Sequence, residues 1–389
     1  MFEVYVHVPF CLRRCGYCDF NTYTATDLGQ GASRGNYATQ AIREMRLVRD
    51  WQTAHGIHEP PASSVFLGGG TPTILPAADL ARMVDAVRDL WGLTTDAEIT
   101  TEANPDTVDA DYVRALADAG FTRISFGMQS AVPHVLRILE RTHTPANVAA
   151  GVRAAQAAGL RVSVDLIYGA PGESLDDWHT SVETALALGV EHLSAYALTV
   201  EPETKMGRKI AAGTLRAPDD DDEAAKYQIV DELCRKAGLA WYEISNWAVP
   251  GQESRHNLGY WRNIDWAGIG PGAHSHYAQT GEDGVRAWDT LHPRAWSAAI
   301  NDGRIPWAGS ERIDKAADLE ERIMLGLRLH EGLDLADIEH RAGRDLHALA
   351  DALEREGLAA MTPSGRMVAT LRGRLLNDTV IERIFDAVL

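Results

Sequence analysis

The sequence predicts an α/β fold in which a partial (β/α)6 barrel is followed by a small C-terminal α/β domain of winged-helix-like form. Two observations predict it. Short β-branched segments alternate with amphipathic helical segments at spacings of about 25–35 residues, which is typical of βαβ units and a parallel sheet. Polar or glycine-rich residues follow nearly every predicted strand, where barrels and open parallel sheets both gather ligands.

The βαβ pattern occupies the first half of the chain. Strands are expected at residues 2–8, 64–67, 98–102, 123–128, 161–167 and 192–198. Helices are expected between them, at residues 37–51, 77–91, 109–119, 145–158 and 175–188. Several of these helices stop at a glycine, as at Gly120, Gly159 and Gly189. This order fits an open doubly wound sheet or part of a barrel, and polar residues after every strand, rather than at one switch point, favour the barrel.

The regular alternation of predicted strands and helices ends at about residue 215. A helix is expected at residues 219–237, opening with an acidic run that suits the positive end of the helix dipole. A strand-like segment and then an irregular, aromatic and glycine-rich stretch at residues 256–273 follow. From about residue 304 the pattern is helical, briefly strand-like at residues 359–370, and helical again. The predicted domains are therefore residues 1–300, the barrel with its extension, and residues 301–389, a domain of the helix–helix–wing kind.

Composition excludes several classes of protein. The 389 residues are 45% hydrophobic and 24% charged, as in ordinary globular proteins. The net charge of −18, without a basic run, argues against a nucleic-acid partner. The N-terminus lacks the features of a signal peptide, and no apolar stretch is long enough to span a membrane. With cysteines too clustered for a disulfide framework, we expect a cytoplasmic location.

Three of the four cysteines, Cys11, Cys15 and Cys18, lie within eight residues in the spacing Cys-x3-Cys-x2-Cys. Structural zinc sites usually have four ligands, and Cys234, isolated in a predicted helix, is expected to be a small buried apolar residue. Three thiolates suit a [4Fe–4S] cluster better, with one iron left open for a ligand. A three-thiolate zinc site with a distant histidine remains the alternative. Arg13 and Arg14 are expected to lower the thiol pKa values.

This cysteine motif follows a strand near the start of a βα barrel and has Tyr17 before its last cysteine, and it resembles the signature of the radical S-adenosylmethionine (SAM) superfamily. The resemblance implies that SAM chelates the open iron and is cleaved to a 5′-deoxyadenosyl radical. The Gly68-Gly69-Gly70-Thr71-Pro72 segment after the second strand matches the element that meets the methionyl ammonium of SAM in that family.

The ends of other predicted strands carry polar groups that could bind the ribose or the carboxylate of SAM. Glu102 could bind ribose hydroxyls, and Arg141 could pair with a carboxylate. The motifs Tyr-Val-His-Val-Pro-Phe-Cys, Phe-Gly-Met-Gln-Ser and Asp-Leu-Ile-Tyr-Gly-Ala-Pro-Gly narrow the resemblance to the oxygen-independent coproporphyrinogen III oxidase group, along nearly the whole chain. The residues that match SAM-contacting positions of that group are Tyr5, Gly69, Gly70, Thr71, Glu102, Gln129, Arg141, Asp165 and Ala197, with Tyr17 matching a contact to a second SAM.

Two departures separate the chain from the oxidase itself. Phe20 stands where the oxidase has a further cysteine, and only four residues precede Tyr5, where the oxidase has a long extension. The segment His-Asn-Leu-Gly-Tyr-Trp at residues 256–261 instead matches His-Asn-x-x-Tyr-Trp of the haem chaperone branch, HemW. His256 is the leading candidate for a haem ligand, although it could instead hydrogen-bond a loop. His7, expected to bond internally, and His143, His274 and His276 are its rivals.

The expected function is therefore haem binding and transfer to haem-requiring proteins at the membrane, with a [4Fe–4S] cluster and SAM. The first alternative is a radical SAM enzyme that decarboxylates, methylates or opens a tetrapyrrole. A radical SAM enzyme with an unrelated substrate is the second, and zinc binding without redox chemistry is the third.

Overall fold

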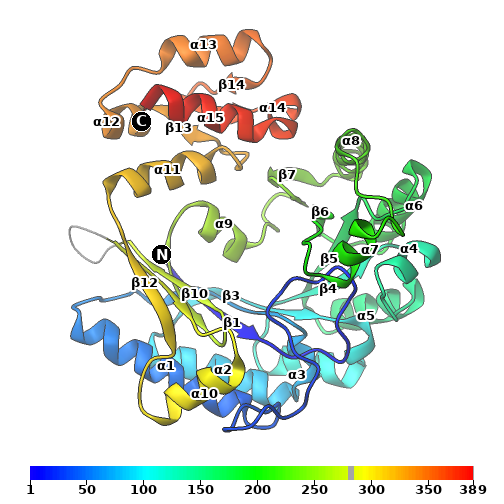
Figure 1. Cartoon of the computed structure of the whole chain (residues 1–389), viewed down its shortest axis with the longest axis vertical. Helices are drawn as coiled ribbons and strands as arrows, with labels where there is room; N and C mark the ends of the chain where they lie inside the picture. Colours follow the sequence, from blue (N-terminus) through cyan, green and yellow to red (C-terminus); the bar gives the residue numbers. More distant parts are fainter. Residues whose placement is uncertain (279–283, 389) are drawn as a thin grey trace.

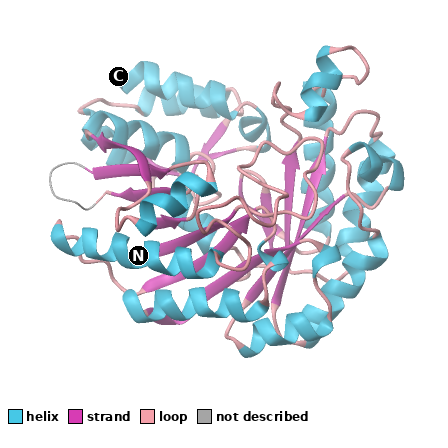
Figure 2. Cartoon of the chain, turned by 60° about the horizontal axis from the view of Figure 1, so that its bottom comes forward, coloured by secondary structure: helices cyan, strands magenta, loops and turns pink. Residues whose placement is uncertain are grey.

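The computed structural model describes residues 1–278 and 284–388. Within these residues, twelve strands form one curved sheet and three more form a small separate sheet. The larger sheet is surrounded on its outside by helices, as Figure 2 shows, and the smaller unit lies at the top of Figure 1 with the C-terminus.

The centre of the large sheet is a run of parallel strands in chain order. These strands are β1 (Phe2–Val8), β2 (Ala62–Gly69), β3 (Leu93–Ala103), β4 (Arg123–Gln129), β5 (Arg161–Tyr168) and β6 (His192–Ala197). Each pairs in parallel with the next, without the reversal of order that marks a doubly wound sheet. The predicted partial barrel is confirmed.

The connections between these strands are the expected helices, whose ends differ from the prediction by a few residues. They are α1 (Tyr37–Ala54), α2 (Ala77–Leu90), α3 (Ala110–Asp118), α4 (Pro133–Ile138), α5 (Pro145–Ala157) and α6 (Leu175–Leu186), with short 3₁₀ turns at Pro72–Ile74 and Pro105–Thr107. Their apolar faces pack on the sheet and form the main core, in which Met45, Val84 and Val152 are fully buried. This burial holds the strand ends in place for a site.

Further strands extend the sheet at both edges. Beyond β1 lie β9 (Asp265–Ile269), β10 (His274–Tyr277), β11 (Gly284–Asp289) and β12 (Trp307–Ile313), and beyond β6 lie β8 (Asn246–Ala248) and β7 (Ala240–Glu243). Strands β12 and β7 are opposite ends of the sheet order, so the barrel stays open. Helices α7 (Lys205–Ala211), α8 (Asp220–Lys236) and α10 (Pro293–Asn301) complete this part. The expectation of helix from residue 304 was wrong for β12, whose conformation is set by pairing with β11.

The stretch that begins at residue 256, expected to be irregular, opens with a helix. Helix α9 (Arg255–Trp261) has only seven residues and begins at Ser254, whose side chain accepts a hydrogen bond from the Asn257 N–H. In Figure 1 it lies between the large sheet and the C-terminal helices. A short helix that places aromatic residues beside a glycine shows no apolar periodicity, which explains why the sequence pattern did not predict it.

The C-terminal part has its own core. It contains α11 (Lys315–Gly326), β13 (Leu333–Asp334), α12 (Leu335–Ala342), α13 (His347–Arg355), β14 (Ala359–Met361), β15 (Arg366–Ala369), α14 (Leu371–Leu375) and α15 (Asn377–Val388). Its antiparallel strands lie in the order β13-β15-β14, and its core includes Leu319, Ile323 and Leu353. The helices followed by a small sheet have the expected helix–helix–wing form, while the predicted boundary at residue 300 stays a prediction.

We searched residues 1–278 and 284–388 for a helix able to cross a lipid bilayer, and none has the required length and apolarity.

A buried ion pair attaches α8 to the loop after β5. The Lys226 Nζ lies 3.1 Å from a carboxylate oxygen of Glu173, and both side chains are fully buried. The ammonium group also donates to the Glu173 carbonyl at 3.0 Å. Burial raises the pKa of Glu173, so the ammonium is what keeps this carboxylate charged in an apolar setting.

We therefore expect Lys226→Ala to lower the free energy of unfolding by about 3–5 kcal/mol, because it leaves a buried carboxylate without its partner. Lys236→Ala on the same helix is the matched control, because its ion pair with Glu232 is exposed on both sides. Denaturant titration followed by circular dichroism measures both changes. Equal losses in the two variants would contradict this account of the buried pair.

Candidate functional site

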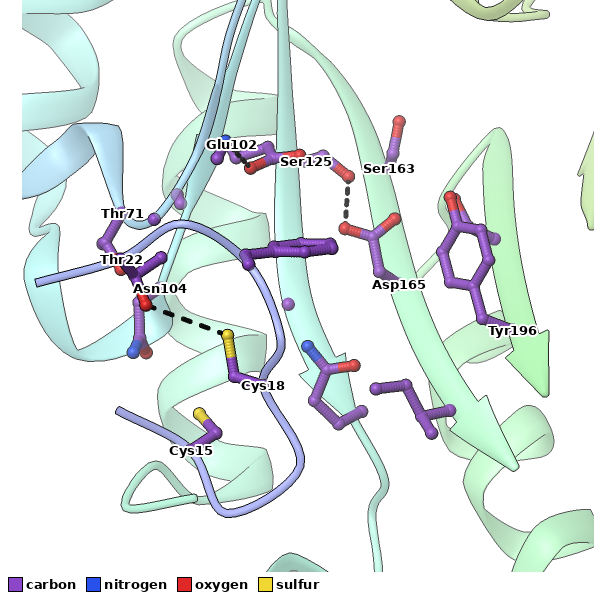
Figure 3. A pocket seen from close by; sticks show the side chains of 18 of the residues that line it. Cys15, Cys18, Thr22, Thr71, Glu102, Asn104, Ser125, Ser163, Asp165 and Tyr196 are labelled. Carbon is purple, nitrogen blue, oxygen red and sulfur yellow. Dashed lines mark hydrogen bonds between the residues drawn. The ribbon is translucent and has the colours of Figure 1, made fainter. Parts of the chain in front are cut away.

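One cavity of about 570 Å³ opens at the C-terminal ends of the parallel strands. It brings together every site residue expected from the sequence. Its lining includes Tyr5, Cys11, Cys15, Tyr17, Cys18, Gly69, Gly70, Thr71, Glu102, Gln129, Arg141, Asp165, Ala197 and His256. Figure 3 shows the thiol loop with Cys15 and Cys18 on one side of this cavity and Asp165 and Tyr196 on the other.

The three thiols lie on the loop between β1 and α1, and none is in a disulfide. Each sulfur atom has a polar neighbour on the cavity wall. The Thr71 hydroxyl donates to Cys11 Sγ at 3.6 Å, and the Arg141 guanidinium donates to Cys15 Sγ at 3.5 Å. The Thr22 hydroxyl lies 4.0 Å from Cys18 Sγ, the contact drawn in Figure 3. The loop thus presents its sulfur atoms to the cavity from one side.

The spread of the sulfur atoms favours one of the two kinds of metal centre. Three thiolates bound to one zinc ion at about 2.3 Å would lie about 3.8 Å from one another. Among residues 1–278 and 284–388, the only group of three His, Cys, Asp or Glu side chains with ligating atoms within 4.8 Å of one another is Glu339, Asp345 and His347. At least one pair of the three sulfur atoms is therefore more than 4.8 Å apart, wider than a single zinc ion would hold them. They fit a larger cluster, in which different irons take different sulfur ligands.

The charge state of the thiols differs from the expectation. Burial raises the pKa of Cys11 to about 11, and it also raises the pKa of Cys18. Arg14 acts on Cys18 in the expected downward direction, but its side chain is exposed and its effect is smaller than that of burial. The predicted downward effect of Arg14 is confirmed at Cys18, but the pKa of both thiols is raised overall, because loss of hydration outweighs a solvent-screened charge.

The glycine-rich turn after β2 forms the wall next to the thiols. A Cβ atom on Gly70 would lie 2.7 Å from the Phe10 carbonyl oxygen and 3.1 Å from Cys11 Sγ, so the position has no room for a side chain. Gly69 has a φ of +103°, a conformation that favours glycine, and its N–H donates to Glu102 at 3.0 Å. The turn thereby exposes backbone groups to a ligand at close range.

Two carboxyl groups face the cavity, Glu102 from β3 and Asp165 from β5, the strands on either side of β4. Burial, together with the nearby Asp165, raises the pKa of Glu102 to about 8. Burial also raises the pKa of Asp165, although the Ser125 hydroxyl donates to it at 2.9 Å, as Figure 3 shows. A positively charged or hydroxyl-rich ligand would offset this loss of hydration, so the pair suits such a ligand.

Gln129 and Arg141 lie on the wall between the thiols and the carboxyl groups. Gln129 has a φ of 64°, unusual for a residue with a side chain, at a point where the β4–β5 register shifts. Such a strained residue at a strand end is typical of a functional site. The Arg141 guanidinium donates to the Gly127 carbonyl at 3.0 Å as well as to Cys15. One side chain therefore ties the thiol loop to β4.

Aromatic residues close the cavity at two places. The Tyr5 hydroxyl contacts His7 Nδ1 at 3.1 Å, and His7 Nε2 contacts the Asn21 carbonyl at 3.0 Å, so the expected internal role of His7 is confirmed. Tyr17 packs against a small apolar cluster that includes Leu139 and Met206. These contacts hold the thiol loop on both sides of Cys18, at Tyr17 and at Asn21.

His256 lies in the floor of the cavity, only 1% exposed, with both ring nitrogens in hydrogen bonds. Its Nδ1 is 2.8 Å from the Ser64 hydroxyl, and its Nε2 is 3.0 Å from the Tyr260 hydroxyl. Its ring stacks on Phe66, with centroids 5.0 Å apart. Burial lowers its pKa to about 3, so the imidazole is neutral. To ligate haem, it would first have to release one of these bonds.

The rival histidines lie elsewhere. His143 is buried and its Nε2 contacts the Met128 carbonyl at 2.8 Å. His274 and His276 do not line this cavity; they line a second one, described below. They lie away from the thiol cavity because β10 lies beyond β9 in the sheet order.

Several lining residues escaped the sequence analysis. They include the hydroxyl residues Ser125, Ser163 and Ser194 on three successive strands, and also Asn104, Phe66 and Tyr196. Small hydroxyl residues within otherwise apolar strands could have predicted these positions, because serine is seldom buried in an apolar core.

Two family models match the chain. The model of the radical SAM superfamily matches residues 5–185, which include the thiol loop and strands β1 to β5. The model of the HemN C-terminal domain matches residues 313–376, which run from the end of β12 through most of the small second unit. Among solved structures, coproporphyrinogen III oxidase (HemN) from Escherichia coli superposes with a TM-score of 0.81 over 100% of this chain and 90% of its own, at 21% identity. This last match shows the fold.

Curated relatives match along nearly the whole chain. A protein from Mycobacterium tuberculosis named haem chaperone HemW is 44% identical, covering 98% of this chain and 94% of the relative. The Bacillus subtilis protein of the same name is 32% identical over 98% of both chains. A mouse relative, mitochondrial radical S-adenosyl methionine domain-containing protein 1, is 35% identical over 85% of this chain and 74% of its own length. The chain belongs to the HemW family of the radical SAM superfamily.

Proposed function

We propose that the protein is a haem chaperone, which binds haem and transfers it to haem-requiring proteins on a [4Fe–4S] and SAM scaffold. The observation that carries the proposal is the whole-chain similarity, at 44% identity, to a protein named a haem chaperone. The motif that begins at His256 supports it, because it packs as one helix between the two parts of the structure. The proposed location is the cytoplasm.

Cys11, Cys15 and Cys18 are the proposed cluster ligands. Their sulfur atoms face one cavity and are spread more widely than one zinc ion requires. When bound, the cluster supplies the electron that cleaves the sulfonium of SAM. The protein's part is to hold the sulfur atoms through Thr71 and Arg141, and to leave one side of the cavity open to a ligand.

The proposed SAM pocket extends from the glycine turn beside the thiols to the carboxyl groups of β3 and β5. The Gly69–Gly70 turn lets backbone groups approach the methionyl end, and Glu102 and Asp165 suit ribose hydroxyls or a positive charge. Tyr5, Thr71, Gln129, Arg141 and Ala197 line the same cavity, as does Tyr17, which could contact a second SAM. Because the chain offers these groups on rigid strand ends, the ligand meets a pre-formed site.

Transfer of cargo, rather than turnover of coproporphyrinogen, is the proposed activity. The oxidase has a cysteine where this chain has Phe20, whose side chain is 58% exposed and lines the cavity. A phenyl group offers neither a thiol hydrogen nor a metal ligand at that place. The proposed receiving partners are haem-requiring proteins at the membrane.

The cluster proposal has a test with an internal control. Anaerobic reconstitution is expected to load about four iron and four sulfide per chain. We expect Cys15→Ala to lose most of this iron and the visible charge-transfer absorption. Cys234→Ala should keep both, because Cys234 is buried in α8, away from the cavity. Tight zinc uptake without iron, or equal iron loss in the two variants, would show that the ligand assignment is wrong.

The SAM pocket is tested by Glu102→Gln. We expect SAM affinity, measured by equilibrium dialysis on cluster-loaded protein, to fall roughly 10–100-fold, because a charge-assisted hydrogen bond contributes about 1.5–3 kcal/mol. Asp111→Asn, at an exposed carboxylate of α3, is the control and should bind SAM like the parent protein. An unchanged affinity in Glu102→Gln, with iron content intact, would remove Glu102 from the pocket.

Haem titration and a product assay separate the chaperone from the oxidase. Haemin added to the reconstituted protein is expected to give a saturable Soret band at about one haem per chain. Incubation with coproporphyrinogen III, SAM and reductant is expected to give no protoporphyrinogen. Sustained product formation, with or without haem binding, would favour the oxidase instead.

A further inference from the structure

A second cavity, of about 530 Å³, lies between the large sheet and helix α11. Its volume falls in the range of small-molecule sites, which is about 300–1,000 Å³. It is lined by Tyr196, Glu243, Ser245, Asn246, Asn257, Tyr260, Trp261, Asn263, Trp266, His274, His276, Arg286, Glu321, Met324 and Leu325. None of the three cysteines of the thiol loop lines it.

Helix α9 separates this cavity from the first one. Of these two cavities, His256 lines the first and not the second, and Trp261 lines the second and not the first. Asn257 and Tyr260 line both, as does Tyr196 at the end of β6. The His-Asn-x-x-Tyr-Trp motif therefore forms a wall with one face toward the thiol cavity and the other toward the second cavity. The motif's aromatic end, rather than its histidine, points to the second cavity.

His276 is the unusual residue of the second cavity. It is 1% exposed, yet neither of its ring nitrogens has a hydrogen-bond partner within the described residues. The nearest carboxylate oxygens, on Asp265 and Glu321, are both 3.7 Å from a ring nitrogen, which is beyond hydrogen-bond distance. Buried imidazoles are normally hydrogen-bonded, as His256 is at 2.8 and 3.0 Å. The imidazole therefore lies between two carboxylates at charge-contact distance without a short hydrogen bond to either, and a movement of the Glu321 side chain would open Nε2 to a ligand.

The rest of the lining suits a large flat molecule with a metal centre and polar edges. The His276 ring stacks on Trp266, with centroids 4.7 Å apart, and Trp266 meets Tyr260 edge to face at 4.8 Å. Met324 and Leu325 supply apolar surface from α11. Arg286, which is ion-paired with Glu321, lies at the same cavity and could bind a carboxylate.

We propose that haem binds in this second cavity, with His276 as an axial ligand of its iron. The inference rests on the proposed haem-chaperone function and adds the place of binding and the ligand. Asp265 lies on the Nδ1 side of the ring, where a carboxylate fixes a ligating histidine in the correct tautomer. Nε2 is then the atom that coordinates the iron. The Glu321 side chain, whose carboxylate lies 3.7 Å from Nε2, moves aside when haem binds. Cargo and SAM thus occupy different sides of α9.

The test compares matched histidine variants of the full-length, cluster-loaded protein. Haemin is titrated into His276→Gln, His256→Gln and the parent chain, and the Soret position, the electron paramagnetic resonance spectrum and the dissociation constant are recorded. We expect His276→Gln to shift the Soret band and to weaken haem binding by on the order of tenfold or more. His256→Gln should keep the parent Soret spectrum. SAM affinity and iron content report the integrity of each variant.

A second variant tests whether haem binds in the second cavity, without changing the proposed iron ligand His276. Met324→Trp enlarges a half-buried side chain of α11 at the cavity wall, and we expect it to weaken haem binding while SAM affinity stays unchanged. Unaltered haem binding in Met324→Trp, or a Soret change in His256→Gln but not in His276→Gln, overturns the proposal and leaves the chaperone function standing. A parent chain that binds no haem contradicts the proposed function itself.

Discussion

The structure depends on a close approach between two backbone segments, the one that leaves β1 and the one that leaves β2. The Gly70 N–H donates to the Val8 carbonyl and the Thr71 N–H to the Phe10 carbonyl, both at 2.8 Å. A side chain at Gly70 would collide with this backbone and with Cys11. The thiol loop is closed by a second pair of bonds, between Cys11 N–H and Tyr23 and between Tyr23 N–H and Pro9. The sulfur atoms are thus placed by the sheet itself.

A buried network of charged side chains fixes the position of helix α9, as the backbone contacts fix that of the thiol loop. The Glu98 carboxylate is fully buried and pairs with Arg161 at 2.9 Å and with Arg123 at 3.5 Å. Its other oxygen accepts the Arg255 N–H, at the start of α9, at 2.9 Å. A carboxylate is favourable at this end of a helix, and the two arginines offset its burial. The network therefore anchors the wall between the two cavities to strands β3, β4 and β5.

The arrangement gives the two cavities different chemistry. The first has thiols, a glycine turn and carboxyl groups whose pKa values are raised by burial, which suits a polar ligand beside a metal centre. The second has stacked aromatic rings and a histidine without a hydrogen bond. Asn257 and Tyr260 of α9 and Tyr196 of β6 line both cavities, so single side chains separate the two.

The sequence by itself determined the strand–helix order, the thiol loop and the strand-end residues. These follow from local spacing, and parallel strands bring their carboxyl ends to one edge however the rest packs. Only the tertiary structure decided the helical state of α9, the strand β12 and the second cavity, because they depend on contacts between segments distant in the chain. It also decided the thiol pKa values and the bonding of each histidine, since burial and hydrogen bonding depend on neighbours that no local pattern specifies.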